Sequence, residues 1–424
     1  MLKELTVRNF KSFNEEATFS MEADVERVSE YPEHVESIND NNLLKIASFY
    51  GPNGGGKTNL IKALMIAKQI QNIESYYLSS DLSCIFNDSN DFEQTIFFVT
   101  ENYEIGYHYI LNTTAENEIE LIDTQIDTQI ARRTPNRIRF NIIKEDIVYR
   151  KNGSTEFISL CSRNKDGVIF GENFLALFEN KNFKLSKTMS IVKYVYDLFA
   201  NNDNLLHEQL EIIKSLYNEI ALIIPLESQM IIVGTPLVRL VKKHTKTLVE
   251  LLNNLDIKIS AIKFYERRSY PIYFERKICI NGKDCIKELP LNAESKGTQK
   301  IFNILIRVLE YMDKGAIFYC DDMNAYLHPK LFKTIIELFH SNKSKSQLIF
   351  NSHDILNMNN NLFRRDEIWF AYRDDNYSTK LVPLSNIVNY KGEQVRKDAK
   401  YYKQYLEGKY GADPFISRGL NWNE

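Results

Sequence analysis

A glycine-rich octapeptide constrains this chain more than any other feature. Residues 51–58 read Gly-Pro-Asn-Gly-Gly-Gly-Lys-Thr and match the phosphate-loop pattern G-x-x-x-x-G-K-[ST] at every constrained position. The apolar stretch 46–50 predicts a buried strand before the loop, and residues 59–64 predict the first turns of a helix after it. Such a turn surrounds an anion with backbone N–H groups, and the helix N-terminus adds partial positive charge. The segment therefore predicts a site for a nucleoside triphosphate, with ATP as the expected ligand.

The side chains of this loop have distinct expected contacts. Lys57 can reach the β- and γ-phosphates, and the hydroxyl group of Thr58 can ligate Mg²⁺. The other residues expected to surround the phosphates are Asn53, Gly54, Gly55, Gly56 and Asn59. The alternative is a glycine-rich turn followed by a chance Lys-Thr pair, but the order of strand, loop and helix favours a phosphate site.

Three further segments follow in a set order. Residues 291–299 read Leu-Asn-Ala-Glu-Ser-Lys-Gly-Thr-Gln, contain the Ser-x-Gly core of an ABC-type signature at Ser295 and Gly297, and precede an apolar helix. The apolar strand 316–320 then ends in Asp321-Asp322, which is a Walker B pattern. A second strand, 347–350, leads into Asn-Ser-His-Asp, where His353 fits a switch histidine. Each segment alone is weak evidence for an ATPase site, and the inference rests on their order along the chain.

Together these segments resemble the SMC-like and OLD-like branch of ABC ATPases. Residues 5–13 (LTVRNFKSF) are similar to the N-terminal strand and turn of that branch, and residues 321–329 (DDMNAYLHP) to its Walker B and D-loop stretch. Residues 364–370 and 405–415 further resemble the AbiL/RloA-type prokaryotic ATPases, which include the ATPase subunit of the PARIS anti-phage system. The resemblance covers roughly residues 1–65 and 235–420.

The resemblance implies an α/β fold, an ABC-type ATPase head with a mixed sheet that carries the phosphate loop, an antiparallel β layer beside it, and a helical insertion. It also implies that Asp321 joins Thr58 in holding Mg²⁺, and that Asp322 polarises the attacking water. Most relatives carry Glu at the latter position, and the shorter Asp predicts slow turnover or a compensating backbone position. His353 is expected to bond the γ-phosphate. Gln94 is the candidate for the metal-sensing glutamine.

The same resemblance predicts assembly. Ser295 and Gly297 of one chain are expected to clamp the nucleotide held by the phosphate loop of a second chain. ATP would then hold two heads together in a homodimer or higher homo-oligomer, and hydrolysis would part them.

Composition excludes several classes of protein. The 424 residues carry a net charge of −3, so charge gives no indication of nucleic-acid binding. Five cysteines form no Cys-x-x-Cys pair, which favours a reducing cytoplasm. No apolar run of 18 residues is present, so we expect no membrane span.

The chain organisation follows from where the motifs lie. Residues 1–165 and 258–424 are expected to form the N- and C-terminal parts of one head, and residues 166–257 a helical insertion. The insertion is too short for a long coiled coil and predicts a compact lobe, which either docks a partner or caps the head. The basic and tyrosine-rich stretch 391–415 is a second candidate docking surface, unless it packs on its own head.

Three functions remain open from the sequence. The first is an ATPase that acts as the sensor and regulatory motor of an anti-phage, abortive-infection or toxin–antitoxin-like system. It would respond to a trigger such as a phage protein and control a separate, nuclease-like effector encoded nearby. The second is an SMC-like head for DNA repair or recombination. The third is an ATP-locked scaffold that hydrolyses slowly.

Overall fold

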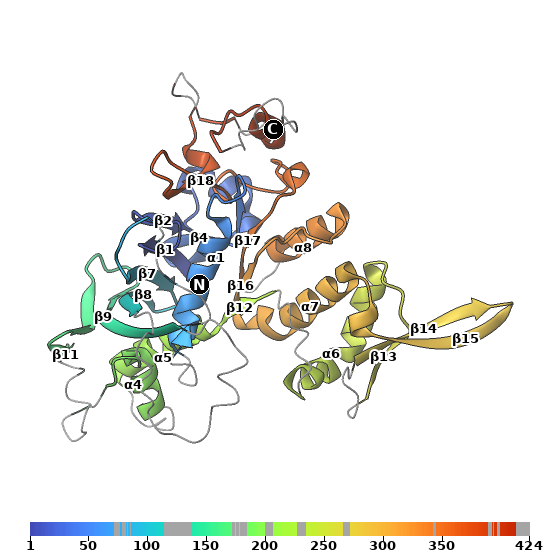
Figure 1. The fold of residues 1–424 in the computed structure, drawn as a ribbon, viewed down its shortest axis with the longest axis horizontal. Helices are drawn as coiled ribbons and strands as arrows, with labels where there is room; N and C mark the ends of the chain where they lie inside the picture. The colour runs from blue at the N-terminus through green and yellow to red at the C-terminus, as the bar shows by residue number, and fades with distance from the viewer. Residues whose placement is uncertain are drawn as a thin grey trace, which may run out of the picture.

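A computed structural model describes residues 1–71, 77, 78, 82, 84, 86–113, 138–171, 174, 178, 185–199, 207–226, 235–265, 272–341, 345–388, 392, 394–396 and 399–412. Two sheets dominate it, with helices between and around them (Figure 1).

The first sheet is six-stranded, in the order β12-β16-β17-β5-β18-β19. The first five strands of this order are parallel, and β19 joins the edge antiparallel. The bounds are β5 Ile46–Tyr50, β12 Ile223–Pro225, β16 Ile317–Cys320, β17 Gln347–Asn351, β18 Ile368–Arg373 and β19 Thr379–Pro383. The central strands β5, β16 and β17 are buried along their whole length because both faces of the sheet are covered.

The second sheet is antiparallel, in the order β11-β10-β9-β8-β7-β1-β2, with β6 paired to β9. Burial alternates along β7, as in a sheet with one face on the core. The bounds are β1 Leu2–Arg8, β2 Ala17–Ser20, β6 Tyr77–Leu78, β7 Asp91–Val99, β8 Tyr103–Thr113, β9 Ile138–Lys151, β10 Ile158–Asn164 and β11 Gly167–Phe170.

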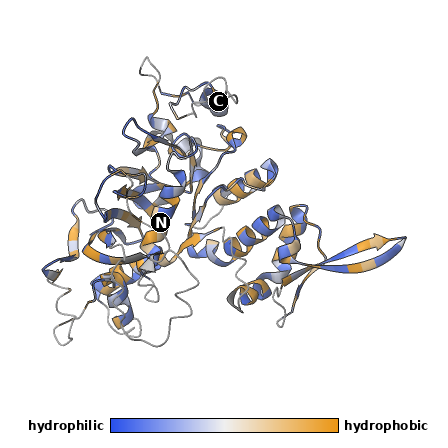
Figure 2. Ribbon diagram, in the orientation of Figure 1, coloured by the Kyte–Doolittle hydropathy of each residue, from blue (hydrophilic) through white to orange (hydrophobic). Residues whose placement is uncertain are grey.

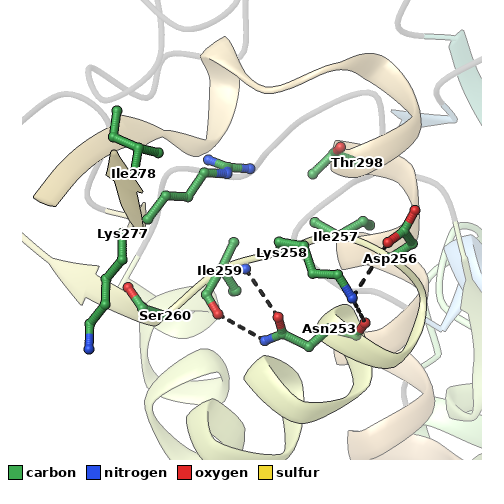
Figure 3. Close-up of a pocket in the computed structure, with 10 residues that line it drawn as sticks. Asn253, Asp256, Ile257, Lys258, Ile259, Ser260, Lys277, Ile278 and Thr298 are labelled. Atoms are coloured by element: carbon green, nitrogen blue, oxygen red, sulfur yellow. Dashed lines mark hydrogen bonds and ion pairs between the residues drawn. The ribbon is translucent and has the colours of Figure 1, made fainter. Parts of the chain in front are cut away.

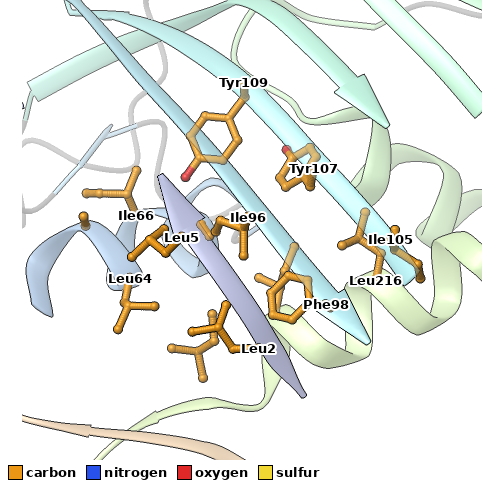
Figure 4. Packing of buried hydrophobic residues seen from close by; sticks show 14 of the residues in the cluster. Leu2, Leu5, Leu64, Ile66, Ile96, Phe98, Ile105, Tyr107, Tyr109 and Leu216 are labelled. Carbon is orange, nitrogen blue, oxygen red and sulfur yellow. The ribbon is translucent and has the colours of Figure 1, made fainter. Parts of the chain in front are cut away.

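The parallel sheet lies between two hydrophobic cores. On one face, α1 (Lys57–Ile70) packs between the two sheets, and Figure 4 shows Leu64 and Ile66 of α1 beside Leu5, Ile96 and other residues of the antiparallel sheet. On the other face lies α8 (Pro329–Ser341), and the same core extends through α7 (Lys296–Tyr311) to α6 (Thr235–Asn254), which packs on α7. Figure 2 shows hydrophobic and hydrophilic residues alternating along these helices. The predicted mixed α/β fold with an antiparallel β layer is confirmed.

Both ends of the chain build this head. The side-chain oxygen of Gln347 accepts a hydrogen bond from the Leu2 N–H at 2.7 Å. Its amide nitrogen donates to the carbonyl oxygens of Leu2 and Leu44 at 2.9 and 3.1 Å. Because Gln347 opens β17, these bonds fix the N-terminal strand to the parallel sheet.

Residues 166–257 are divided between the two cores. The helices α4 (Ile191–Phe199) and α5 (Glu208–Ala221) pack against the antiparallel sheet, β12 joins the parallel sheet beside β16, and α6 packs on α7. The sequence predicts one compact lobe here, and the structure instead distributes these helices over the head. The apolar periodicity locates each helix, but it does not indicate which core receives it.

A buried carboxylate joins α4 to the antiparallel sheet. Glu145 of β9 accepts hydrogen bonds from the Ile191 N–H at 2.9 and 3.0 Å and from the Tyr107 hydroxyl group at 2.9 Å. Burial raises the pKa of Glu145 to about 7, although Ile191, Arg163 and Tyr107 each favour its ionised form.

A three-stranded sheet of β13 (Ala261–Phe264), β14 (Ile272–Ile280) and β15 (Lys283–Pro290) lies beside α6, and its β14–β15 hairpin projects from the head (Figure 1). Asn281 and Gly282 form the turn of this hairpin, with φ values of 51° and 77°. The remaining elements are the pair β3 (Val35–Ile38) and β4 (Asn41–Leu44), the helix α9 (Tyr401–Leu406), and the short 3₁₀ helices Val25–Glu30, Pro32–His34, Leu291–Ala293, Met312–Lys314, Ile355–Asn357 and Leu384–Asn386.

The C-terminal stretch packs on its own head where it is described. Tyr405 stacks on Phe370 of β18 with ring centroids 5.5 Å apart, and Tyr410 lies 5.2 Å from the same ring. Lys391, Lys397 and Phe415 of the candidate docking stretch lie outside the described residues. In the part of the chain that the structure describes, none of the helices has the length and apolarity needed to cross a bilayer.

Candidate functional site

The phosphate loop connects β5 to α1, as its flanking residues predict. Asn53 and Gly54 are exposed at the loop apex, whereas Gly55 and Gly56 are buried. A side chain at Gly51 would place its Cβ 2.1 Å from the Ala371 carbonyl oxygen, and one at Gly56, where φ is 107°, would lie 2.2 Å from the Thr379 hydroxyl oxygen. The loop therefore requires glycine where it packs against β18 and β19.

Lys57 begins α1 and points its amine back into the loop. The Nζ atom donates to the carbonyl oxygens of Gly51 and Pro52 at 2.8 and 2.9 Å. Burial lowers the pKa of Lys57, while Asp322 and Asp321 oppose this shift. The loop thus holds a buried cation on its own backbone oxygens, which an incoming phosphate oxygen could replace.

A group of oxygen atoms lies next to this amine. The Thr58 hydroxyl group donates to the Asp321 carboxylate at 3.0 Å. The Asn351 side-chain amide also donates to Asp321. Hydroxyl and carboxylate oxygens are the ligands that Mg²⁺ prefers, so Thr58 and Asp321 fit the predicted ion.

Asp322 is held through its backbone in the left-handed region, with φ 49°. Its N–H donates to the Asn351 side-chain oxygen at 2.6 Å, and its carbonyl accepts from Lys300 Nζ at 2.8 Å. These two bonds leave its carboxylate half-exposed and 3.7 Å from His353 Nε2. A residue in a rarely populated conformation that its neighbours hold in place is typical of functional sites.

His353 follows β17 and is positioned by the turn that follows β16 (residues 321–327), which we call the Walker B turn. The Asn324 side-chain oxygen accepts from the Ser352 hydroxyl group at 2.9 Å and from the His353 N–H at 3.2 Å. Burial and the neighbouring Lys57 lower the pKa of His353 below its ordinary value of 6.5, against the attraction of Asp322 and Asp321. This shift favours the neutral imidazole, which presents one N–H donor.

The turn formed by residues 291–298, which we call the signature turn, lies at the start of α7. The Ser295 hydroxyl group caps this helix by accepting from the Thr298 N–H at 3.1 Å. Gly297 packs so closely on the Tyr326 carbonyl oxygen that a Cβ would lie 2.6 Å from it. Among the described residues, no hydrogen bond or ion pair joins residues 291–298 to the phosphate loop of the same chain.

A pocket lies beside the signature turn, at the base of the projecting hairpin (Figure 3). Its volume is about 520 Å³, and its lining includes Thr298 of α7 and Arg276 of β14. Arg276 also forms a bidentate ion pair with Glu294, at 2.5 and 2.9 Å, which fixes the hairpin to the signature turn.

Several residues of the site received no role from the sequence, among them Ser12, Asn351 and Thr379. The Ser12 hydroxyl oxygen accepts from the Asn59 side chain and from the Thr379 hydroxyl group, each at 2.8 Å. Asn351 joins Asp321 to the Asp322 backbone, as described above. Ser12 lies within residues 5–13 and Asn351 within residues 347–354, two segments that indicated the site, so their positions in these segments could have identified them. Thr379 follows an acidic loop and has no such signal.

Gln94 is fully buried on β7. Its amide nitrogen donates to the Ala63 carbonyl oxygen at 3.1 Å, and its oxygen accepts from the Tyr109 hydroxyl group. Both ends of the amide therefore join α1 to the antiparallel sheet, and a metal-sensing role for Gln94 stays a prediction.

A second polar cluster lies around the start of β18. The phosphate loop follows the end of β5, the parallel neighbour of β18, so the cluster and the loop lie at opposite ends of these two strands. His34 Nδ1 and His340 Nε2 each lie 2.9 Å from a different oxygen of buried Glu367. Burial opposes ionisation of Glu367, but the two imidazoles outweigh it and lower its pKa to about 2. The imidazole rings stack at 3.4 Å and 9°, so their in-plane lone pairs run parallel and do not converge on one ion. The cluster is therefore a hydrogen-bonded support for β18.

Comparison with known proteins assigns the chain to a family. A comparison with curated proteins gave no match. Similar solved structures include the SMC head domain from Thermotoga maritima, with 14% identity, 90% of this chain and 98% of that chain covered, and a TM-score of 0.37. Another is an SmcHead bound to the C-winged helix domain of ScpA, with 13% identity, coverages of 90% and 96%, and a TM-score of 0.39. A third is an Smc head domain with an extended coiled coil bound to the C-terminal domain of ScpA derived from Pyrococcus furiosus, with 14% identity, coverages of 90% and 95%, and a TM-score of 0.38.

A family model matches most of the chain, residues 46–359, and is described as "AAA domain, putative AbiEii toxin, Type IV TA system". This span includes the phosphate loop, the signature turn, Asp321, Asp322 and His353. The narrower AbiL/RloA assignment stays a prediction. The chain belongs to the AAA-domain family that this model describes.

Proposed function

We propose that this protein binds and hydrolyses ATP, and that it uses the cycle to control a separate effector in a prokaryotic defence system. The observation that carries the proposal is the arrangement of Lys57, Thr58, Asp321, Asp322 and His353 around one end of the phosphate loop. An amine, a pair of hard oxygen ligands, a water-orienting carboxylate and an imidazole N–H donor are groups that can serve phosphoryl transfer to water.

Each residue has a part in this reaction. Lys57 exchanges the carbonyl oxygens of its own loop for oxygens of the β- and γ-phosphates. Thr58 and Asp321 hold Mg²⁺, which when bound neutralises phosphate charge. Asp322 accepts a hydrogen bond from the attacking water, and His353 donates its N–H to a γ-phosphate oxygen. Water attacks the γ-phosphorus, the bond to the β,γ-bridging oxygen breaks, and ADP and phosphate leave.

The signature turn acts on the nucleotide of a second chain. Ser295 is exposed, caps a helix N-terminus, and has no link to the phosphate loop of its own chain among the described residues. A helix N-terminus favours anions, and exposure makes this one accessible to a partner. Lys300 of the same helix also holds the Asp322 carbonyl, so docking at the turn couples to the Walker B turn. ATP would therefore close two heads, and hydrolysis would open them.

Control of a separate effector rests on the resemblance to the AbiL/RloA-type ATPases. The matching family model, described as a putative AbiEii toxin of a type IV toxin–antitoxin system, supports the link to defence. We identify no nuclease motif in this sequence, so we place the toxic activity in a partner protein.

A slowly hydrolysing scaffold is the second candidate, and one observation favours it. The carboxylate of Asp322 is one methylene shorter than that of Glu, and 3.7 Å separates it from His353. A displacement of about 1 Å can cost about a hundredfold in rate. Steady-state ATPase turnover, measured with and without DNA, separates the regulatory ATPase, the scaffold and an SMC-like DNA-repair head.

The binding half of the proposal is tested with Lys57→Ala, with Lys62→Ala on the next turn of α1 as the matched control. Calorimetry should show that Lys57→Ala abolishes tight ATP binding, because Lys57 is the cation that the structure places inside the loop. Lys62→Ala should bind as the unmodified chain does. Equal ATP affinity in all three proteins would remove the phosphate-loop assignment.

The cellular half is tested by phage challenge of cells that carry this gene, its neighbouring gene, or both. We expect protection to require both genes and an intact Lys57. Protection by this gene alone, retained in Lys57→Ala, would exclude effector control.

A further inference from the structure

The hairpin turn between β18 and β19 presents a tyrosine in an unusual backbone conformation. Tyr377 has φ 60° and an exposed fraction of 64%. The turn is well defined, because the Asp374 backbone exchanges hydrogen bonds with Tyr377 and Ser378 at 2.9 Å, and its carboxylate accepts from the Asn376 N–H at 3.0 Å. Glycine or asparagine is favoured at such a position, so a bulky aromatic residue there indicates a function outside the turn.

Two other side chains complete a stacked group with Tyr377. The ring of Phe86 stacks against that of Tyr377, with centroids 6.4 Å apart and planes at 21°. The Arg373 guanidinium group lies 5.7 Å from the centroid of the Phe86 ring. We call Phe86, Arg373 and Tyr377 the aromatic platform.

The aromatic platform is attached to the phosphate loop. Arg373 Nε donates to the carbonyl oxygen of Gly54, at the loop apex, at 2.7 Å. Ser378, next to Tyr377, has a hydroxyl oxygen that accepts from the Asn14 N–H at 3.2 Å. The platform therefore keeps a fixed position relative to the loop backbone.

Strand order places the platform at the end of the site opposite the reactive groups. Asp321 follows β16 and His353 follows β17, both on one side of β5 in the parallel sheet. Arg373 and Tyr377 lie at β18 and its turn, on the other side of β5. A nucleotide whose terminal phosphate lies near Asp321 and His353 would cross the loop and extend its base toward β18 and β19.

We propose that the aromatic platform binds the base of the nucleotide, with the exposed Tyr377 ring and the Arg373 plane as the stacking surfaces. This inference rests on the proposed ATP function and adds the part of the site that recognises the base. Every base has a π-face, so stacking of this kind holds purines generally and does not distinguish adenine from guanine.

The test uses Tyr377→Gly, because glycine adopts the positive φ of this turn without strain and preserves the hairpin. Binding of ATP, GTP and inorganic tripolyphosphate is measured by calorimetry. The variant should bind ATP and GTP about tenfold more weakly than the unmodified chain, the loss expected for one base stack. Its affinity for tripolyphosphate, which has no base, should be unchanged.

Tyr377→Phe is the matched control, since it keeps the ring and should retain ATP affinity. Unchanged ATP binding in Tyr377→Gly would overturn the proposal, and so would an equal loss for ATP and tripolyphosphate, which would indicate a distorted loop. Lys57→Ala separates this inference from the function beneath it, because it should abolish tripolyphosphate binding as well. If Lys57→Ala binds both ligands normally, the phosphate-loop assignment fails first.

Discussion

Replacing Asn351 with alanine removes a residue that joins the two aspartates of the site. Its amide donates to the Asp321 carboxylate, and its oxygen accepts from the Asp322 N–H at 2.6 Å. A bond to a charged group contributes about 1.5–3 kcal/mol to stability and a neutral bond about 0.5–1.5 kcal/mol, so Asn351→Ala should cost about 2–4 kcal/mol. A domain of ordinary stability, about 5–15 kcal/mol, remains folded after this loss.

The effect on catalysis should be larger than the effect on binding. Without Asn351, the Asp322 N–H loses its acceptor, and the left-handed backbone of Asp322 keeps the bonds that its carbonyl oxygen accepts from Lys300 Nζ at 2.8 Å and from the Ala325 N–H at 2.9 Å. A shift of about 1 Å in the carboxylate corresponds to about a hundredfold lower kcat. The Kd for ATP should change much less, because Lys57 and the loop backbone remain in place.

Single-turnover hydrolysis at saturating ATP, together with calorimetric ATP binding, measures the two effects separately. Asn253→Ala is the matched control, since the Asn253 amide also bridges backbone groups, at Val249 and Ile259, outside the loop and the Walker B turn. The control should lose stability and keep its kcat. If Asn351→Ala keeps a kcat within about threefold of the unmodified chain, Asn351 does not position the water-activating group.

Three further predictions follow from the same geometry. Asp322→Asn should bind ATP, stop hydrolysis and accumulate closed dimers in size-exclusion chromatography, whereas unchanged turnover would point to another acid. Ser295→Arg and Lys57→Ala chains should each be inactive, but mixing them should restore part of the ATPase rate, because one composite site of the mixed dimer carries neither defect; no recovery would place signature and loop in one chain. The free energy of unfolding should fall by on the order of 3 kcal/mol as the pH rises from 4.5 through 7, because the fold favours protonated Glu145 over its ionised form. Glu145→Gln should remove this part of the pH dependence of Tm. An identical profile in that variant would show that burial of Glu145 does not control it.

The sequence predicts the site best where one short segment contains both a strand and the functional residue at its end. The strands β5 and β16 are mostly apolar segments followed directly by Gly51 and Asp321, and the mostly apolar β17 ends at Asn351, so their positions could be predicted. The parallel order β16-β17-β5, which brings those ends together, depends on pairing between strands far apart in the chain.

Other elements could not be predicted because their role depends on a neighbour. The strand β12 has only three residues and ends in Pro225, which an edge position tolerates. Thr379 acts through Ser12, which lies in the N-terminal segment. A role for Tyr377 can be inferred only from its φ and its stacking on Phe86, which the structure shows. Periodicity carries no information about such contacts.

The place of β5 in the parallel sheet has a consequence for biosynthesis. Its two partners, β17 and β18, end more than three hundred residues after it, so a ribosome working at about 5–20 residues per second leaves this strand unpaired for about 15–60 s. During that interval the nascent chain exposes a strand that is fully buried in the folded protein, together with a glycine loop that lacks its packing partners. Chaperone supply, temperature and translation rate should therefore govern the yield of folded protein more strongly than its final stability does, and a truncated N-terminal half should aggregate even though it contains the complete phosphate loop.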